Sequence, residues 1–276
     1  NNFLRKKIEH TVYHTETPIF RSAPIPMMGL SNLAKSKNKK FILSGEGADE
    51  ILLGYDIFKL PKINYFLNVN ENSKFRYLII KNLYNHLPQF KNNKYLKLIS
   101  LLYSNKNEFS KKFSCHYYRY ANNLKILSIL KKNLTKNEIN KYFSVFKKQK
   151  NFTDIEFAQE IEKKTLLSNY LLSSQGDRML MANSVEGRYP FLDLEFVNFC
   201  NKIPENIKLK FLNEKNILKS TYKIKIPHKI SKRKKFPYQS PDMNAFLDDD
   251  FISKHLNKKK LTDLEIFDTN VIYNLI

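Results

Sequence analysis

The stretch that decides the fold is Lys39-Lys40-Phe41-Ile42-Leu43-Ser44-Gly45-Glu46-Gly47-Ala48-Asp49-Glu50-Ile51-Leu52-Leu53-Gly54-Tyr55. Residues 39–43 form an apolar run bounded by charge on one side and by serine and glycine on the other, which predicts a short buried strand. The chain has only 6 glycines, and Gly45, Gly47 and Gly54 all lie just after this strand. A glycine-rich turn between a strand and a helix is a position where backbone N–H groups bind phosphate. The stretch therefore predicts a phosphate site on a strand–turn–helix unit.

Acidic residues crowd the same turn, at Glu46, Asp49 and Glu50. Clustered carboxylates beside a phosphate need a cation, and Mg²⁺ is the natural one. The alternative is that these acids complement the dipole at the start of a helix. The residues alone leave both interpretations open. The turn is neither a Walker A loop nor a GxGxxG loop, because Glu50 occupies the third glycine position.

The flanking sequence predicts an α/β start followed by a helical remainder. Residues 11–16 resemble a second strand, and apolar residues with helical spacing lie between the two strands at 27–34. This order indicates a parallel α/β unit over residues 1–60. Residues 61–276 are predicted to be mainly helical. Their predicted helices include one over 75–87 that Pro88 ends, one over 95–102, and one that Thr153-Asp154-Ile155-Glu156 opens as a capping box.

Composition limits the class of protein. The 276 residues, 42% of them hydrophobic and 13% aromatic, exclude a disordered or disulfide-knot chain. No run approaches the ~18 apolar residues of a membrane span. Cys115 and Cys200 cannot make a disulfide framework or a CxxC metal site, so a reducing, cytoplasmic setting is the default, and Cys200 is predicted to be a buried apolar filler. The net charge of +22 suggests an anionic partner, but the lysines are spread along the chain, so we expect no nucleic acid.

Three blocks of sequence carry a resemblance to a known family. Ser44–Glu50 with Gly54-Tyr55 resembles the SGEG(S/A)DE…GY signature of glutamine-hydrolysing asparagine synthetases. Residues 176–193, Gly-Asp-Arg-Met-Leu-Met-Ala-Asn-Ser-Val-Glu-Gly-Arg-Tyr-Pro-Phe-Leu-Asp, are similar to the family's DRM.MA.S.E.R.PFLD. Residues 232–241 resemble its RxK segment, and Ile266-Phe267-Asp268 a further stretch. The blocks follow the family's order, and the resemblance covers essentially the whole chain.

The resemblance implies a fold and a reaction. The fold would be an adenine-nucleotide α-hydrolase-like (PP-loop ATP pyrophosphatase) synthetase domain, predominantly helical after its first two strands. The reaction would form an amide from aspartate through an acyl-adenylate, with ATP, Mg²⁺ and ammonia from glutamine. The family's SGGxDS loop and its glutaminase domain do not occur in these residues. We therefore expect residues 1–276 to be a truncated synthetase-type domain that makes no asparagine alone.

The resemblance also implies roles for individual residues. Catalysis would fall to Glu46 and Lys235, with Asp49 as the Mg²⁺ ligand. Ser44, Gly45 and Arg21 would bind the nucleotide phosphates. Tyr55, Glu186 and Arg188 would lie on the substrate side.

Each of these roles has an alternative. Lys235 is otherwise one more surface lysine of a basic run, or Lys234 takes its place. Tyr55 is otherwise a core residue, and Glu186 with Arg188 a scaffold salt bridge. Because a lysine in a half-buried site needs a carboxylate to stay charged, we expect Lys235 and Glu46 to meet in one cleft. We expect Asp49 to flank this cleft with its carboxylate free for Mg²⁺.

The implied partners are aspartate or a similar carboxylate and a glutaminase domain that supplies ammonia, with a homodimer possible in the cytoplasm. Other functions stay open at this point. Related amidotransferases that act on other carboxylates share all three blocks, although Glu46 favours the asparagine-type site. A non-catalytic remnant that binds a nucleotide or a partner is a second alternative. A basic helical nucleic-acid-binding protein is the third, but the chain lacks a recognition motif with interleaved aromatic and basic residues.

Overall fold

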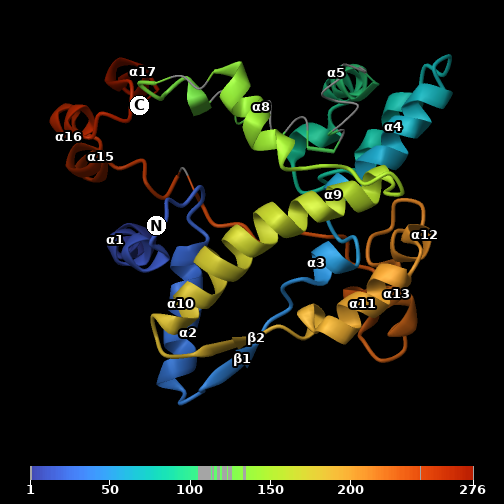
Figure 1. Cartoon of the computed structure of the whole chain (residues 1–276), viewed down its shortest axis with the longest axis horizontal. Helices are drawn as coiled ribbons and strands as arrows, with labels where there is room; N and C mark the ends of the chain where they lie inside the picture. Colours follow the sequence, from blue (N-terminus) through green and yellow to red (C-terminus); the bar gives the residue numbers. More distant parts are fainter. Residues whose placement is uncertain are drawn as a thin grey trace.

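The computed structural model describes residues 2–104, 113, 115–116, 119, 123, 126–132, 135–242 and 244–275 (Figure 1). Most of the regular structure in this part of the chain is helical. The α-helices are α1 (Asn2–Thr15), α2 (Pro24–Ser36), α3 (Ala48–Ile51), α4 (Leu60–Val69), α5 (Asn93–Ser104), α8 (Lys136–Ser144), α9 (Asp154–Glu162), α10 (Arg178–Met181), α11 (Leu194–Lys202), α12 (Glu205–Lys208), α13 (Asn216–Thr221), α14 (His228–Ser231), α15 (Asp249–His255), α16 (Lys258–Asp263) and α17 (Thr269–Tyr273). The 3₁₀ turns are η1 (Asp56–Lys59), η2 (Arg76–Asn82), η3 (Pro88–Lys91) and η5 (Pro190–Leu192), and η4 (Lys163–Asp177) is π-helical.

The sheet of the described residues consists of two parallel strands, β1 (Phe41–Leu43) and β2 (Glu186–Arg188). Ile42 lies opposite Gly187 in the register. The predicted strand at 39–43 is therefore confirmed over its last three residues, but its predicted burial is wrong. Phe41 is 57% exposed and Leu43 is 71% exposed.

The predicted strand at 11–16 is wrong, because residues 11–15 form the end of α1 and Glu16 follows it. The inward side chains of this helix are Leu4, Ile8, Thr11 and Thr15, which repeat every three or four residues. Thr11 and Thr15 are fully buried, and their hydroxyls donate to the backbone carbonyls of Lys7 and Val12. Because a threonine can be buried in a helix when its hydroxyl bonds to the helix backbone, the residues at 11–15 suit a helix as well as a strand. The parallel partner of β1 is thus β2, which comes much later in the chain.

Three of the other predicted helices are confirmed, and one is wrong. The helix expected at 27–34 is α2, and α5 contains the stripe at 95–102. The capping box at Thr153 opens α9: the Thr153 hydroxyl accepts from Glu156 N at 3.1 Å, and Thr153 N donates to the Glu156 carboxylate at 2.8 Å. The helix expected at 75–87 is instead a 3₁₀ turn, η2. Tyr84 breaks it with a φ of 46°, because its N–H turns to the Asp56 carboxylate at 2.7 Å.

The main core lies between α4, η2, α5 and α9. Phe58, Ile63, Leu67, Ile80 and Leu96 are fully buried there. A smaller cluster under α3 and α11 contains Cys200, which is 2% exposed, as the sequence predicts. Figure 1 shows α9 and η4 running across the molecule, and α3 packs against α9, α11 and η5. The turn between β1 and α3 is thereby held from three sides.

Candidate active site

The glycine-rich turn follows β1 directly, as predicted, and leads into α3. Gly47 has a φ of 89°, and a Cβ there would clash with the side chain of Leu192, so only glycine fits. A Cβ on Gly45 would meet no atom within 4 Å, so that residue faces open space. Within the described residues, the N–H groups of Gly45 and Gly47 have no protein acceptor. The exposed Gly45 therefore offers a free donor on an open face, which suits an anion, whereas Gly47 is buried.

Asp49 in α3 is the centre of the charged cluster beside this turn. Its Oδ1 lies 2.8 Å from the Lys215 ammonium and its Oδ2 lies 2.8 Å from the Lys235 ammonium. The Lys235 ammonium also lies 5.3 Å from the centre of the Tyr55 ring, within the range of a cation–π contact. Lys235 is therefore drawn into this cluster and does not point into solvent. Lys234 is exposed, and its ammonium lies 3.5 Å from the Asn85 amide oxygen.

The structure pairs Lys235 with a different carboxylate from the expected Glu46. The carboxylate that pairs with Lys235 is that of Asp49, so the expectation that the Asp49 carboxylate is free is wrong. Glu46 is half-buried and lies within electrostatic reach of the same charges. Burial and the charge of Asp49 raise the pKa of Glu46, and the two lysines partly oppose this increase. Asp49 takes Lys235 because the first turn of α3 directs its carboxylate at both ammonium groups.

Tyr55 and Glu50 form a buried pair behind this cluster. The Tyr55 hydroxyl donates to Glu50 Oε1 at 2.7 Å, and Glu50 is fully buried. Gln159 on α9 anchors the same turn, since its amide donates to the Glu50 carbonyl at 2.7 Å. The Tyr55 ring packs against the main core as well as under Lys235. The two interpretations of Tyr55, core residue and site residue, are thus compatible.

Burial raises the pKa of Glu50 to about 7, although the hydrogen bond from Tyr55 lowers it in part. A carboxyl group with a raised pKa in the folded state stabilises the fold most below its unfolded pKa of 4.5, and that stability is lost as the pH rises to about 7. We expect Glu50→Gln to flatten this dependence and to leave the protein about 2 kcal/mol more stable than wild type at pH 8. Urea unfolding between pH 4.5 and pH 8 measures the difference. Parallel pH curves for the two proteins would contradict this assignment.

Gly54 lies against the Asp49–Lys215 pair. Its N–H donates to the Asp49 carbonyl at 2.7 Å, and a Cβ on Gly54 would clash with Asp49 Oδ1 and Lys215 Cε. We expect Gly54→Ala to cost about 2 kcal/mol of unfolding free energy because the methyl group overpacks this contact. Gly45→Ala is the matched control, since its methyl group meets open space. Denaturant unfolding measures both variants. Equal stability would mean that the contact of Gly54 with Asp49 and Lys215 has room for a methyl group.

A second carboxylate, Glu214, holds the backbone of Lys235. Glu214 Oε1 accepts from Lys235 N at 3.0 Å and from the Lys219 ammonium at 2.9 Å, and Oε2 lies 3.0 Å from the Lys59 ammonium. Burial alone would raise the pKa of Glu214, but the Lys59 charge and these hydrogen bonds outweigh burial and lower it to about 2. Lys59 is in turn paired with Asp56 at 2.7 Å. Lys235 is therefore fixed at both its backbone and its side chain.

Three other predicted residues lie apart from this cluster. Arg188 and Glu186 form an ion pair of 2.9 Å on β2, and both side chains are more than half exposed, as the scaffold alternative predicts. The Arg188 carbonyl accepts a hydrogen bond from Ser44 N at 2.8 Å. Arg21 lies over the rings of Phe20 and Tyr170, and among the described residues it forms no hydrogen bond or ion pair with the turn. The structure thus brings together Ser44, Gly45, Glu46, Asp49, Tyr55 and Lys235.

Sequence reasoning missed Glu214 and Lys215. The one available signal is an acidic residue in a basic stretch, Lys208 to Lys219, which is otherwise uninformative. Lys215 also has a φ of 50°, a left-handed conformation that is uncommon for lysine and is not readable from the sequence.

The cluster does not fit a Mg²⁺ ion held by protein ligands. Both oxygens of Asp49 are paired with ammonium groups, which a dication would have to displace. Among the residues that the structure describes, no three His, Cys, Asp or Glu side chains gather into a site that would hold a metal by protein ligands alone. The positive charge at this site is supplied by lysines.

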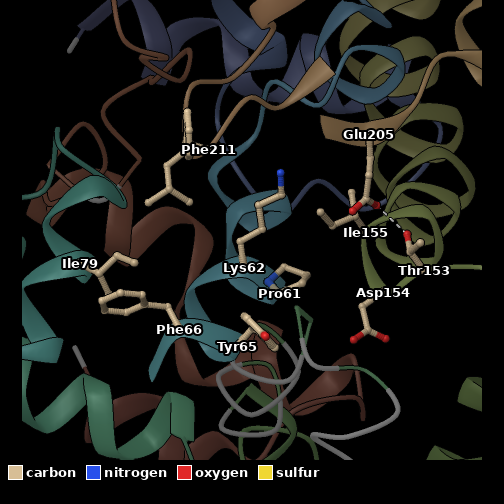
Figure 2. Close-up of a pocket in the computed structure, with 11 residues that line it drawn as sticks. Pro61, Lys62, Tyr65, Phe66, Ile79, Thr153, Asp154, Ile155, Glu205 and Phe211 are labelled. Atoms are coloured by element: carbon tan, nitrogen blue, oxygen red, sulfur yellow. Dashed lines mark hydrogen bonds between the residues drawn. The ribbon is translucent and has the colours of Figure 1, made fainter. Parts of the chain in front are cut away.

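A groove of about 580 Å³ lies elsewhere, between α4, η2 and the start of α9 (Figure 2). Tyr65 and Phe66 lie along it, and at one end the Thr153 hydroxyl donates to the Glu205 carboxylate at 2.7 Å. None of its lining residues belongs to the cluster around Asp49.

Comparison with known proteins points to one family. The sequence model of the asparagine synthase family matches residues 1–276. Asparagine synthetase [glutamine-hydrolyzing] 1 of Bacillus subtilis is 28% identical over 83% of this chain and 35% of its own length. Amidase chyE of Penicillium rubens is 24% identical over 79% of this chain and 34% of its own length. A putative asparagine synthetase of Mycobacterium bovis is 24% identical over 83% of this chain and 34% of its own length. The chain thus spans about a third of the length of the curated relatives it matches.

No solved structure matches the chain. Among the described residues, no helix has the length and apolar character needed to span a membrane.

Proposed function

Because the chain belongs to the asparagine synthase family, we propose that it takes part in the ATP-dependent conversion of aspartate to asparagine. One observation supports this most: Lys235 and Lys215 converge on Asp49 beside an open glycine turn with a free N–H donor at Gly45. Such a site brings two lysine ammonium groups together and faces outward at one end, which suits binding of a nucleotide polyphosphate. Glu46 and Tyr55 line the same cluster.

The proposed reaction has two steps. An oxygen of the aspartate side-chain carboxylate forms a bond to the α-phosphorus of ATP, and the bond to pyrophosphate breaks. Ammonia, supplied by a glutaminase domain, then attacks the acyl carbon, and AMP leaves with that carboxylate oxygen.

Charge accumulates on the phosphate oxygens during the first step. A lysine ammonium in a partly buried site stabilises such charge more strongly than it would in water. Lys235 suits this role, because its side chain is 23% exposed and Glu214 holds its backbone. The half-buried Glu46 carboxyl, with its raised pKa, orients the amine of Lys235 or the substrate. Mg²⁺ would accompany ATP, but the residues here assign it no protein ligand set.

Oxygen transfer tests the proposal. Aspartate labelled with ¹⁸O in its side-chain carboxylate is expected to pass one label to AMP when the natural polypeptide that carries these residues is supplied with ATP and ammonia. Unlabelled AMP, or cleavage of ATP to ADP, would contradict an acyl-adenylate.

Residues 1–276 alone are expected to release no pyrophosphate above a protein-free control, because the SGGxDS phosphate loop is not among them. Pyrophosphate release that depends on aspartate in this preparation would contradict this expectation.

A second candidate is amide formation on another carboxylate. Two relatives are named as amidases, chyE of Penicillium rubens and chry2 of Gibberella zeae. Carboxylate-dependent exchange of pyrophosphate into ATP, measured across a set of amino acids and other acids, distinguishes the two. Exchange with aspartate alone supports the first candidate, and exchange with a different acid supports the second.

A further inference from the structure

Asp49 is shared between two lysines that come from different segments of the chain. The Lys215 ammonium lies 2.8 Å from Oδ1 and the Lys235 ammonium lies 2.8 Å from Oδ2. The three side chains are 16% (Asp49), 21% (Lys215) and 23% (Lys235) exposed, so water screens them only in part. One carboxylate thus faces two ammonium groups, so it stays paired with a cation if either lysine leaves.

Lys215 is packed into this contact and is held there by its backbone. It has a left-handed backbone conformation immediately before α13, and its Cε lies against Gly54 closely enough to exclude a Cβ. The preceding residue, Glu214, is 3% exposed and accepts a hydrogen bond from the backbone of Lys235. Two neighbouring residues therefore control Lys235, one at its backbone and one through the carboxylate that it shares.

Binding of an anion places opposite demands on the Lys235–Asp49 ion pair: the phosphate needs the Lys235 ammonium, and so does the Asp49 carboxylate. The Lys235 ammonium has to turn from Asp49 toward the incoming phosphate. Leaving a mostly buried carboxylate without any cation is strongly unfavourable, and the negative charge of Glu46 nearby makes it more so. A second cation on Asp49 removes the conflict, because the carboxylate stays paired after Lys235 has moved.

We propose that Lys215 is a positioning residue, which keeps Asp49 paired so that Lys235 can leave that carboxylate for the phosphate of a bound nucleotide. The inference rests on the proposed function in that it takes Lys235 as the group that meets the anion. It adds a role for a residue that the family resemblance did not single out.

Binding of inorganic pyrophosphate without added magnesium, measured by calorimetry on the natural polypeptide that carries these residues, tests the inference. Lys215→Met is expected to weaken binding about tenfold, because Lys235 then stays on Asp49. Lys223→Met is the matched control: it removes the same charge at an exposed lysine with no ion pair among the described residues, and about a twofold change is expected. Lys215→Arg, which keeps a cation, is expected to bind within about threefold of wild type.

The decisive comparison is made in an Asp49→Asn background. There, no carboxylate needs a second cation, so adding Lys215→Met is expected to have no more effect than adding Lys223→Met. An equal loss in both backgrounds would mean that Lys215 acts by its own charge, and would overturn the inference. If circular dichroism shows Lys215→Met to be unfolded, Lys215→Gln in the same two backgrounds replaces it.

The inference and the proposed function fail in different ways. If the wild-type protein binds pyrophosphate, and Lys215→Met weakens this binding no more than Lys223→Met does, the role of Lys215 is overturned. The anion site itself is then unaffected. No measurable pyrophosphate binding by the wild-type chain would contradict the anion site itself, and the inference would fall with it.

Discussion

Lys235→Ala is expected to lower carboxylate-dependent exchange of pyrophosphate into ATP by about 10³-fold, because it removes the cation that meets the polyphosphate. Within the described cluster, Lys235 is the lysine that is held at two points. Its ammonium pairs with the Asp49 carboxylate, and its backbone N–H donates to the buried Glu214. Loss of this charge acts on the transition state, so the turnover number is expected to fall more than the apparent affinity for aspartate.

The measurement is made on the natural polypeptide that carries these residues. Lys234→Ala is the control, since this neighbour is exposed and its one side-chain hydrogen bond to the described residues is to Asn85 at 3.5 Å, and it is expected to stay within about twofold of wild type. Hydrolysis of glutamine is expected to persist in both variants. Equal losses in the two variants would mean that the segment acts by its general charge, and the assignment of Lys235 would be wrong.

Glu214→Gln is expected to cost about 3 kcal/mol of unfolding free energy at pH 7. The variant keeps a polar group for Lys235 N but removes the charge that faces Lys59 and Lys219 in a site where the Glu214 side chain is only 4% exposed. The pH dependence follows from the lowered pKa. Stability that a carboxylate with a folded pKa of about 2 provides is present above its unfolded pKa of 4.5 and is lost as the pH falls towards 2.

Urea unfolding of both proteins between pH 2 and pH 7 measures this effect. The gap between wild type and Glu214→Gln is expected to close as the pH falls below 4.5. Glu195→Gln, at an exposed glutamate on α11, is the control and is expected to change stability by less than about 0.5 kcal/mol. A gap that stays constant over the whole pH range would mean that the Glu214 charge contributes nothing to the fold.

The sequence predicts the local elements of the site well and their partners less well. A run of apolar residues next to Ser44-Gly45 is enough to place a strand and a turn, and a Thr-x-x-Glu box is enough to place α9. Strand pairing is a long-range property, so the sequence at 11–16 could not show that β1 pairs with β2 instead. The buried threonines of α1 made this segment misleading.

In the candidate site too, the sequence predicts individual residues better than their contacts. A motif match singled out Lys235 and Asp49, and the structure places them in contact. It could not show that Asp49 holds two lysines, because Lys215 lies far from Asp49 in the chain and carries no motif of its own. Whether Lys235 faces Glu46 or Asp49 depends on how α3 directs its first turn, which is set by the packing of α3 against α9, α11 and η5.

The most direct test of the central claim is a crystal structure of the natural polypeptide with ATP and a carboxylate substrate bound. We expect phosphate oxygens within about 3 Å of the Lys235 ammonium and of the Gly45 N–H group, with Lys215 still paired with Asp49. A nucleotide bound elsewhere, such as in the groove between α4 and α9, with Lys235 still paired with Asp49, would contradict this claim.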